Sequence, residues 1–229
     1  MSQLFSRRAV LMQIGSAVIA GASSVPRHAF ADLDSQPWFF LTDDEARWLA
    51  AIVDVFIPQD EFPSASQAGV VDFIDFQMAT GYGQGEGLYL KGPFPEGTPQ
   101  QGYQLPMTPA EMMRAGLTEL RGETDLTAMP TADRAAWVDD LSNRDNMLGD
   151  VPSSTFFEEL LSLTNEGYFA DPIYRGNADY AGWRMVGFPG AHAYYTERVG
   201  DNKPTNQPPM GIAHGQLNQV SPRKIEQGG

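Results

Sequence analysis

The chain has 229 residues, of which 42% are hydrophobic, and its 29 acidic side chains outnumber its 15 basic ones to give a net charge of −14. This charge would repel a phosphate backbone or an anionic lipid, so the composition argues against nucleic acid and acidic membrane surfaces as partners. Cysteine is absent, which excludes disulfides, thiolate-bound iron–sulfur clusters and the covalent attachment of c-type haem in this chain.

The first 31 residues have the pattern of an export signal. Arg7 and Arg8 form a basic region, Ala9 to Ala22 is mostly apolar, and Ala29-Phe30-Ala31 is a small-x-small cleavage site. The apolar run is shorter than the roughly 20 residues that span a membrane, so no direct membrane span is expected. An ordinary secretory signal fits this pattern, but the paired arginines favour a twin-arginine address. We expect cleavage after Ala31 and a periplasmic location.

The expected mature protein, residues 32–229, keeps 12 basic and 29 acidic side chains, for a net charge of −17. Its length suits one domain. We expect a mainly α, single helical domain over residues 32–195, with long ordered loops rich in glycine, proline and aromatic residues. Residues 196–229 are polar and proline-rich, and we expect an extended tail that only a partner would order.

Two capping boxes mark the starts of predicted helices. Thr42-Asp43-Asp44-Glu45 precedes apolar residues at helical spacing, and Pro58 ends that helix. A second helix is predicted over 70–79. Thr108-Pro109-Ala110-Glu111 starts a third, with proline at the favoured first helical position. Between the second and third helices, residues 81–107 alternate glycine, proline and aromatic residues. We expect an ordered loop there, with room for a short hairpin, whose aromatic residues dock on another surface.

Three further helices are predicted between residues 131 and 186, because apolar residues recur there at helical spacing. Each begins near a residue that caps helices, and the second ends at a glycine. The expected helices are Thr131–Leu141, with Ala135, Val138 and Leu141 on the inner side, Ser154–Gly167, and Asp179–Val186. No segment shows the alternation of a half-buried strand.

No catalytic, cofactor-binding or metal-binding constellation is recognised in the sequence. The glycines of Gly81 to Gly87 lack the spacing and the preceding strand of a nucleotide-binding loop. His192 and His214 have no neighbours at metal-ligand spacing. Paired carboxylates, Asp72 and Asp75 among them, are expected on a solvated helix face. Two alternative functions stay open. The chain could be a stand-alone periplasmic enzyme that uses unrecognised carboxylates, or it could be a small-molecule binding module.

The stretch "GYFADPIYRGNADYAGWRMVGFPGAH", residues 167–192, is the densest in aromatic and turn-forming residues. Asp171-Pro172 favours a turn, and Gly176-Asn177 permits a second turn with positive φ. A loop packed over the domain's own core would have this composition. So would a partner interface, since tyrosine, tryptophan, phenylalanine, methionine and arginine anchor protein–protein contacts.

Three stretches resemble one family: "LTDDEARWLAAIVDVFIPQDEFPSASQAGVVDFIDFQ" (41–77), "YGQGEGLYLKGPF" (82–94) and "EGYFADPIYRGNADYAGWRMVGFPGA" (166–191). They are similar to the small subunit, subunit 3, of membrane-bound gluconate 2-dehydrogenase. That family also covers the small subunits of fructose, sorbitol and glucose dehydrogenases of the same type. The resemblance covers most of residues 41–191.

The resemblance implies a heterotrimer that is membrane-associated through its other subunits. A GMC-type large subunit would hold FAD and oxidise the sugar or sugar acid, and a multihaem cytochrome c subunit would pass electrons to quinone. FAD, an iron–sulfur cluster and haem c are thus expected in the partner subunits, with no cofactor in this chain. The implied task of the small subunit is to assist folding, stability and co-export of the large subunit.

The resemblance also implies two sets of recognition residues. The translocase would read Arg7 and Arg8. Contact with the large subunit would involve Tyr168, Phe169, Tyr174, Trp183 and Phe188, at or beneath the interface, with Asp171, Pro172, Gly176 and Asn177 setting the shape of the loop.

Overall fold

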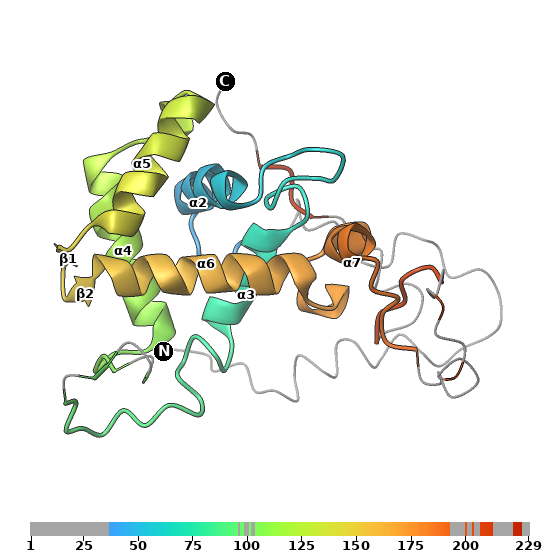
Figure 1. Cartoon of the computed structure of the whole chain (residues 1–229). Helices are drawn as coiled ribbons and strands as arrows, with labels where there is room; N and C mark the ends of the chain where they lie inside the picture. Colours follow the sequence, from blue (N-terminus) through green and yellow to red (C-terminus); the bar gives the residue numbers. More distant parts are fainter. Residues whose placement is uncertain are drawn as a thin grey trace.

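The computed structural model describes residues 37–95, 97–98, 101, 104–192, 200, 203, 207–212 and 222–225 (Figure 1). Arg7, Arg8 and the expected cleavage site after Ala31 lie outside these ranges. Within them, no helix combines the length and the apolarity that crossing a bilayer requires.

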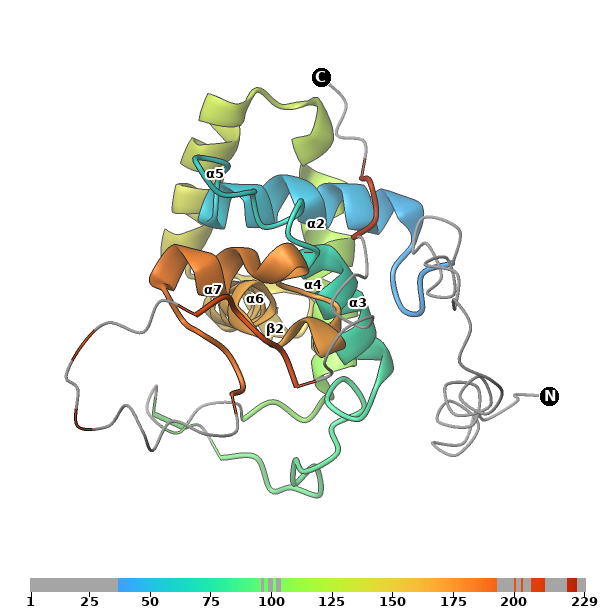
Figure 2. The same ribbon diagram turned by 90° about the vertical axis from the view of Figure 1, so that its right-hand side faces the viewer.

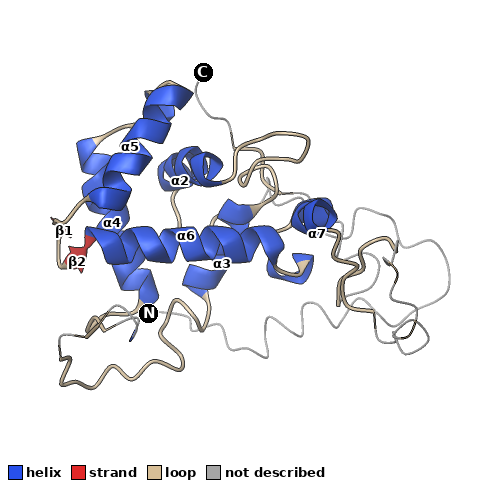
Figure 3. Ribbon diagram, in the orientation of Figure 1, coloured by secondary structure: helices blue, strands red, loops and turns tan. Residues whose placement is uncertain are grey.

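The described residues form a mainly α domain, as predicted (Figure 3). Short 3₁₀ turns and one two-stranded antiparallel pair accompany the helices. The α-helices are α2 (Asp43–Phe56), α3 (Val70–Ala79), α4 (Pro109–Glu123), α5 (Thr131–Asn143), α6 (Ser153–Phe169) and α7 (Ala181–Val186). The other elements are η3 (Leu126–Ala128), β1 (Met147–Leu148), β2 (Val151–Pro152), η4 (Pro172–Tyr174) and η5 (Ala178–Tyr180).

Helix α6 is the centre of the domain. It packs against α2, α3, α4, α5 and α7, and Figure 1 shows it running across the molecule between the strand pair and α7. Phe156, Leu160 and Leu163 of α6 are fully buried. A Cβ on Gly116 of α4 would lie 2.1 Å from a ring carbon of Phe156. The glycine therefore lets α4 approach the central helix closely enough to pack against its aromatic ring.

The local helix signals are confirmed at α2, α3 and α4. Thr42 accepts a hydrogen bond from the Glu45 backbone N–H, and the Glu45 carboxylate accepts one from the Thr42 backbone. Thr108 and Glu111 form the same reciprocal pair at the start of α4. Helix α3 has the predicted bounds. These starts were predictable because each cap is made within four residues of the chain.

The prediction for α5 was wrong at its cap and at Ala135, whereas Val138 and Leu141 are buried as predicted. Pro130 is the N-cap and makes no side-chain cap, so Thr131 is the first helical residue. Ala135 is exposed, whereas Arg134 is buried. The Arg134 guanidinium donates to the Met129 carbonyl at 2.8 Å and so binds the turn before the helix. A long cationic side chain can cover apolar surface in this way while its donors are satisfied by backbone oxygens.

Two further predictions were wrong: the residue that ends α6 and the residue at which α7 begins. Gly167 does not end α6, which continues to Phe169. A Cβ on Gly167 would lie 2.9 Å from the Phe73 ring, so this glycine permits the close crossing of α6 over α3. Helix α7 begins at Ala181 with Tyr180 as N-cap, because Asp179 belongs to the preceding 3₁₀ turn. The predicted stop at Gly187 is confirmed.

The loop between α3 and α4 contains no strand in its described residues, and it contacts the helices on either side. The Tyr82 hydroxyl donates to the Glu159 carboxylate on α6, and burial raises the pKa of that carboxyl group. The Ala110 N–H donates to the Gly83 carbonyl at 3.0 Å. Tyr89 is 77% exposed. The described part of the loop is therefore held against α4 and α6 through Tyr82 and Gly83, and it leaves Tyr89 exposed.

Candidate functional site

The acidic pair of α3 is buried, and the prediction of a solvated face was wrong. Asp72 and Asp75 are 1% and 0% exposed. The Asp75 carboxylate accepts the backbone N–H groups of Phe39 at 3.0 Å, Phe40 at 2.8 Å and Leu41 at 3.0 Å. A buried carboxylate is tolerated when hydrogen bonds replace its water. Asp75 thus binds the segment that leads into α2.

Asp72 binds the other end of the chain. Its carboxylate accepts the backbone N–H of Arg223 at 3.0 Å, and the Arg223 Nε atom lies 3.5 Å from the second carboxylate oxygen. The Arg223 guanidinium lies 3.8 Å from the centroid of the Trp38 ring and donates to the Pro37 carbonyl. In Figure 2, segment 222–225 passes beside the beginning of α2. We call Asp72, Asp75, Arg223 and residues 37–41 the acidic joint.

Burial raises the pKa of Asp72 to about 6, because the carboxylate has lost most of its water. The hydrogen bond and the charge of Arg223 act in the opposite direction, as does the charge of Arg175. The Arg175 guanidinium lies 4.7 Å from the centroid of the Phe39 ring and 5.0 Å from that of Phe76. The joint is therefore a compact set of charges beneath aromatic rings.

Two segments of the tail, residues 207–212 and 222–225, contact the domain itself. They contain no helix or strand, and an isolated parallel bridge joins Met210 to Gly190. The Ile212 N–H donates to the Asp171 carboxylate at 2.6 Å. Segment 222–225 contributes Arg223 to the acidic joint. Segments 207–212 and 222–225 are therefore bound to the domain, and the prediction that a partner orders the tail stays a prediction.

The aromatic stretch 167–192 is anchored by two buried rings. Tyr168 is fully buried, and its hydroxyl donates to the Pro63 carbonyl at 2.8 Å. Trp183 is 6% exposed, and its Nε1 donates to the Phe169 carbonyl at 2.7 Å. These two predicted interface residues therefore lie beneath the surface.

The four residues predicted to set the loop's shape are all buried. Asp171 caps η4 by accepting the Ile173 N–H at 3.0 Å, and Pro172 is the first residue of that turn. The Asn177 side chain donates to one backbone carbonyl and accepts one N–H, at 2.7 and 2.9 Å. A Cβ on Gly176 would lie 2.1 Å from the backbone oxygen of Gly167, so the close approach requires a glycine there.

The backbone between residues 175 and 180 is unusual. Four non-glycine residues there have positive φ, with values from 52° to 83°, and no other described non-glycine residue does. They are Arg175, Asn177, Asp179 and Tyr180. A left-handed conformation is unfavourable for such residues and persists only where the surroundings impose it. The buried hydrogen bonds of Asn177 and Trp183 supply that constraint.

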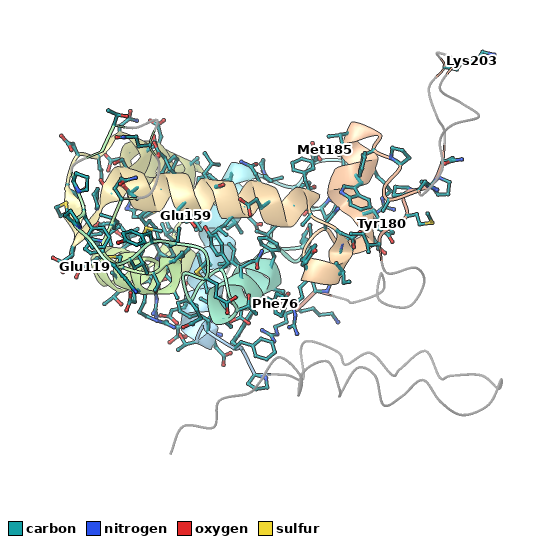
Figure 4. The ribbon with its side chains drawn as sticks, turned by 90° about the horizontal axis from the view of Figure 1, so that it is seen from below. Phe76, Glu119, Glu159, Tyr180, Met185 and Lys203 are labelled. Atoms are coloured by element: carbon teal, nitrogen blue, oxygen red, sulfur yellow. The ribbon has the colours of Figure 1, made fainter. Side chains whose placement is uncertain are left out.

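Above this scaffold lies a set of exposed apolar side chains. Met185 is 36% exposed, Val186 61% and Phe188 46%. Figure 4 shows Met185 and Tyr180 at the α7 end of the molecule, far from Glu119. We call the set the apolar face: Phe169, Ile173, Tyr174, Met185, Val186 and Phe188.

Sequence reasoning named Phe169, Tyr174 and Phe188 of this face and missed the other three residues. Helix α7 has only six residues, too few for a hydrophobic period to separate the inward Trp183 from the outward Met185 and Val186. The sequence signal available was the run of apolar residues itself.

An open depression of about 360 Å³ adjoins the apolar face. Helices α3 and α6 form its walls, and Phe73, which is 2% exposed, forms its base. It is lined by Phe73, Gln77, Glu166, Phe169, Ala170 and Tyr174. Among these six residues, Glu166 is the one with a charged side chain, and it accepts a hydrogen bond from the Ser162 hydroxyl at 3.2 Å.

Metal ligands do not gather anywhere in the described part of the chain. No group of three or more histidine, aspartate or glutamate side chains there could hold an ion. The His192 Nε2 atom lies 3.4 Å from the Pro208 carbonyl oxygen, and His214 lies outside the described residues.

A family model matches the part of the chain that contains the apolar face and the acidic pair of α3. The model of the family described as gluconate 2-dehydrogenase subunit 3 matches residues 43–190, more than half of the chain. The chain belongs to the gluconate 2-dehydrogenase subunit 3 family. This confirms the resemblance noted in the sequence. No curated protein and no solved structure matched the chain.

Membership in the gluconate 2-dehydrogenase subunit 3 family makes this chain an accessory subunit of a multi-subunit dehydrogenase complex. The matched residues include the acidic pair of α3 and the whole apolar face. They do not include segment 222–225, which supplies Arg223 to the acidic joint.

Proposed function

We propose that this subunit 3 chain is the non-catalytic small subunit of a periplasmic, membrane-associated flavoprotein–cytochrome c dehydrogenase. It binds the GMC-type, FAD-containing large subunit through the apolar face. By doing so it assists the folding, stability and twin-arginine co-export of that subunit. A multihaem cytochrome c subunit completes the complex, and FAD, the iron–sulfur cluster and haem c belong to the partner subunits. The observation that carries the proposal is the apolar face on its constrained scaffold.

The exposure of the face supports a protein contact. Aromatic residues and methionine are enriched at the centres of protein interfaces, and neighbouring exposed apolar side chains mark interaction sites. The depression and α7 belong to one surface, because a Cβ on Gly182 of α7 would lie 2.9 Å from the Phe169 ring. The face therefore offers several anchors to the same partner.

The scaffold supports tight binding. Ordering flexible loops and side chains on association costs free energy, so a contact that is already rigid binds more strongly. Here the Trp183 indole and the Asn177 amide hold the backbone beneath the face. The positive-φ residues of 175–180 are strained, and strain of this kind clusters at functional sites.

Binding through the apolar face can be tested with two exposed residues of that face. We expect Val186→Ser together with Phe188→Ser to weaken binding of the purified large subunit by at least about 30-fold, because truncated interface anchors cost about 2 kcal/mol or more. Met147→Ser is the matched control, since Met147 is 57% exposed at the opposite end of the molecule (Figure 1). Binding equal to that of the control would exclude this face.

Co-export can be tested at the leader. We expect Arg7→Lys with Arg8→Lys to leave both this chain and the large subunit in the cytoplasm, because the paired arginines are the address that the translocase reads. Cell fractionation with a flavin assay measures the outcome. Normal arrival of the large subunit in the periplasm would contradict co-export while leaving the binding proposal intact.

The non-catalytic role has a direct test as well. The chain purified alone should not oxidise gluconate, fructose, sorbitol or glucose with an added electron acceptor. Turnover above the level of a buffer control would favour the stand-alone enzyme instead.

A further inference from the structure

The depression beside the apolar face has the chemistry of a site for a cation. Phe169 and Tyr174 contribute aromatic rings, and Gln77 contributes an amide. Glu166 contributes a carboxylate. Ring faces attract cations electrostatically, and a carboxylate pairs with them directly.

The positions of these groups follow from helix geometry. Glu166 and Phe169 are three residues apart on α6, so they share one face of that helix, and Ala170 follows as its C-cap. Phe73 and Gln77 are four apart on α3, and Gly167 lets the two helices cross closely. The lining is thus built on two packed helices, with Tyr174 added from η4.

The neighbouring cation of this chain does not occupy the depression. Arg175 follows Tyr174 directly, but its guanidinium lies between the rings of Phe39 and Phe76, near the acidic joint. Arg175 is not among the residues that line the depression. None of the six lining residues therefore supplies a cation to the carboxylate of Glu166.

We propose that the depression receives an arginine side chain of the large subunit, which pairs with Glu166 and stacks on Phe169 and Tyr174. This rests on the proposed function, because it assigns an anchor to the same interface. Arginine suits the site better than lysine, since its planar guanidinium stacks on rings while its donors reach the Glu166 carboxylate and the Gln77 amide oxygen.

Charge complementarity favours the same occupant. The mature chain carries a net charge of −17, so a partner surface that docks here without repulsion is basic or neutral. An anionic sugar acid would meet the carboxylate of Glu166 at the rim and be repelled. A cationic side chain is attracted both by the Glu166 carboxylate and by the net negative charge of the subunit.

The test compares charge changes on one helix. Glu166→Gln removes the charge and keeps the shape, and Glu166→Lys reverses the charge. Glu158→Lys is the control, because Glu158 is also an exposed residue of α6 but does not line the depression. Affinity for the purified FAD-containing large subunit is measured at low and high salt, and thermal unfolding verifies that each variant is folded.

We expect Glu166→Gln to bind about tenfold more weakly and Glu166→Lys about a hundredfold more weakly or worse, as for a desolvated charge pair. Glu158→Lys should stay within about threefold of the unaltered chain, because an exposed charge outside the depression contributes little. The loss for Glu166→Gln should shrink at high salt.

Two failures are distinguishable. If Glu166→Gln and Glu166→Lys bind like Glu158→Lys while the Val186/Phe188 variant loses binding, the arginine site is wrong and the apolar face stands. If the Val186/Phe188 variant also binds normally, the docking face itself is wrong, and the arginine site is overturned with it.

Discussion

The acidic joint and the apolar face differ in which side chains they bury and which they expose. In the joint, carboxylates and a guanidinium are buried, and in the face, phenylalanine, methionine and valine are exposed. The joint is tolerable because its charged groups find hydrogen bonds or opposite charges inside the protein. The face instead leaves apolar side chains in contact with water, although Phe169 and Phe188 each pack one edge on a buried ring. The joint therefore contributes to the stability of the fold, whereas the face is the surface that we propose for recognition.

The two regions also differ in how far apart in the sequence their residues lie. The joint brings together residues 37–41, α3 and Arg223, so its contacts span most of the chain. The face is built almost entirely within residues 169–188. Variants in the joint should lower stability without a specific effect on binding, and variants in the face should do the reverse. The predictions below test that separation.

The largest effect is expected at Asp75. Asp75→Ala removes an acceptor from three backbone N–H groups and should lower the free energy of unfolding by about 3–5 kcal/mol, as for a broken buried charge network. Urea unfolding measures the change. Asp139→Ala, an exposed aspartate on α5, should cost less than about 0.5 kcal/mol. A loss below about 1 kcal/mol for Asp75→Ala would mean that the joint does not stabilise the fold.

Asp72 should make stability depend on pH. Burial raises its pKa from 3.8 to about 6, so the folded protein binds this proton more tightly than the unfolded chain does. The stability contributed by the proton is fully present below pH 3.8 and is lost as the pH rises through 6. Relative to Asp72→Asn, the free energy of unfolding should therefore fall by roughly 2–3 kcal/mol between pH 4 and pH 7.

The measurement is urea unfolding of both proteins across that pH range. Taking the difference removes the titration of the other carboxylates, and it leaves Asp72 with its neighbours Arg223, Arg175 and Asp75. A constant difference would show that Arg223 balances burial at Asp72, and a difference that grows with pH would show that Arg223 outweighs it.

A pair of glycine substitutions examines the scaffold beneath the face. Gly176→Ala places a Cβ 2.1 Å from the backbone oxygen of Gly167 and should cost about 1–3 kcal/mol, as for other overpacked sites. Gly122→Ala, in α4, meets nothing within 4 Å and should stabilise the protein by up to about 1 kcal/mol. Thermal unfolding compares the two. Equal shifts would mean that the turn at Gly176 relaxes without resistance.

The helices could be predicted from sequence because their determinants are local. The capping boxes at Thr42 and Thr108, and the apolar periodicity of α3, each operate within a few residues. The joint could not be predicted in this way. The partners of Asp75 lie 34 to 36 residues away, and Arg223 lies 151 residues from Asp72. A carboxylate at helical spacing looks the same in sequence whether water or a distant backbone faces it.

The aromatic stretch was predictable in composition and not in orientation. Its rings were recognised as a set, but Tyr168 and Trp183 are buried while Phe169 and Phe188 are exposed. The orientation depends on left-handed residues such as Arg175 and Tyr180, whose residue types have no sequence signature for that conformation. Three-dimensional structure was needed to separate anchors that face outward from rings that hold the fold.

The smallest effect on stability is expected for the apolar face. Met185→Ser together with Val186→Ser should change the free energy of unfolding by less than about 1 kcal/mol, because Val186 is 61% exposed and Met185 is 36% exposed at the surface. Trp183→Ala, on the same short helix, should cost about 3–5 kcal/mol, because it empties a buried site and leaves the Phe169 carbonyl without its donor. Any loss of partner binding by Trp183→Ala would then follow from unfolding, whereas the Met185/Val186 variant should lose binding while fully folded. If the Met185/Val186 variant unfolds as easily as Trp183→Ala, the face is part of the core, and the distinction between a stabilising joint and a recognition face does not hold.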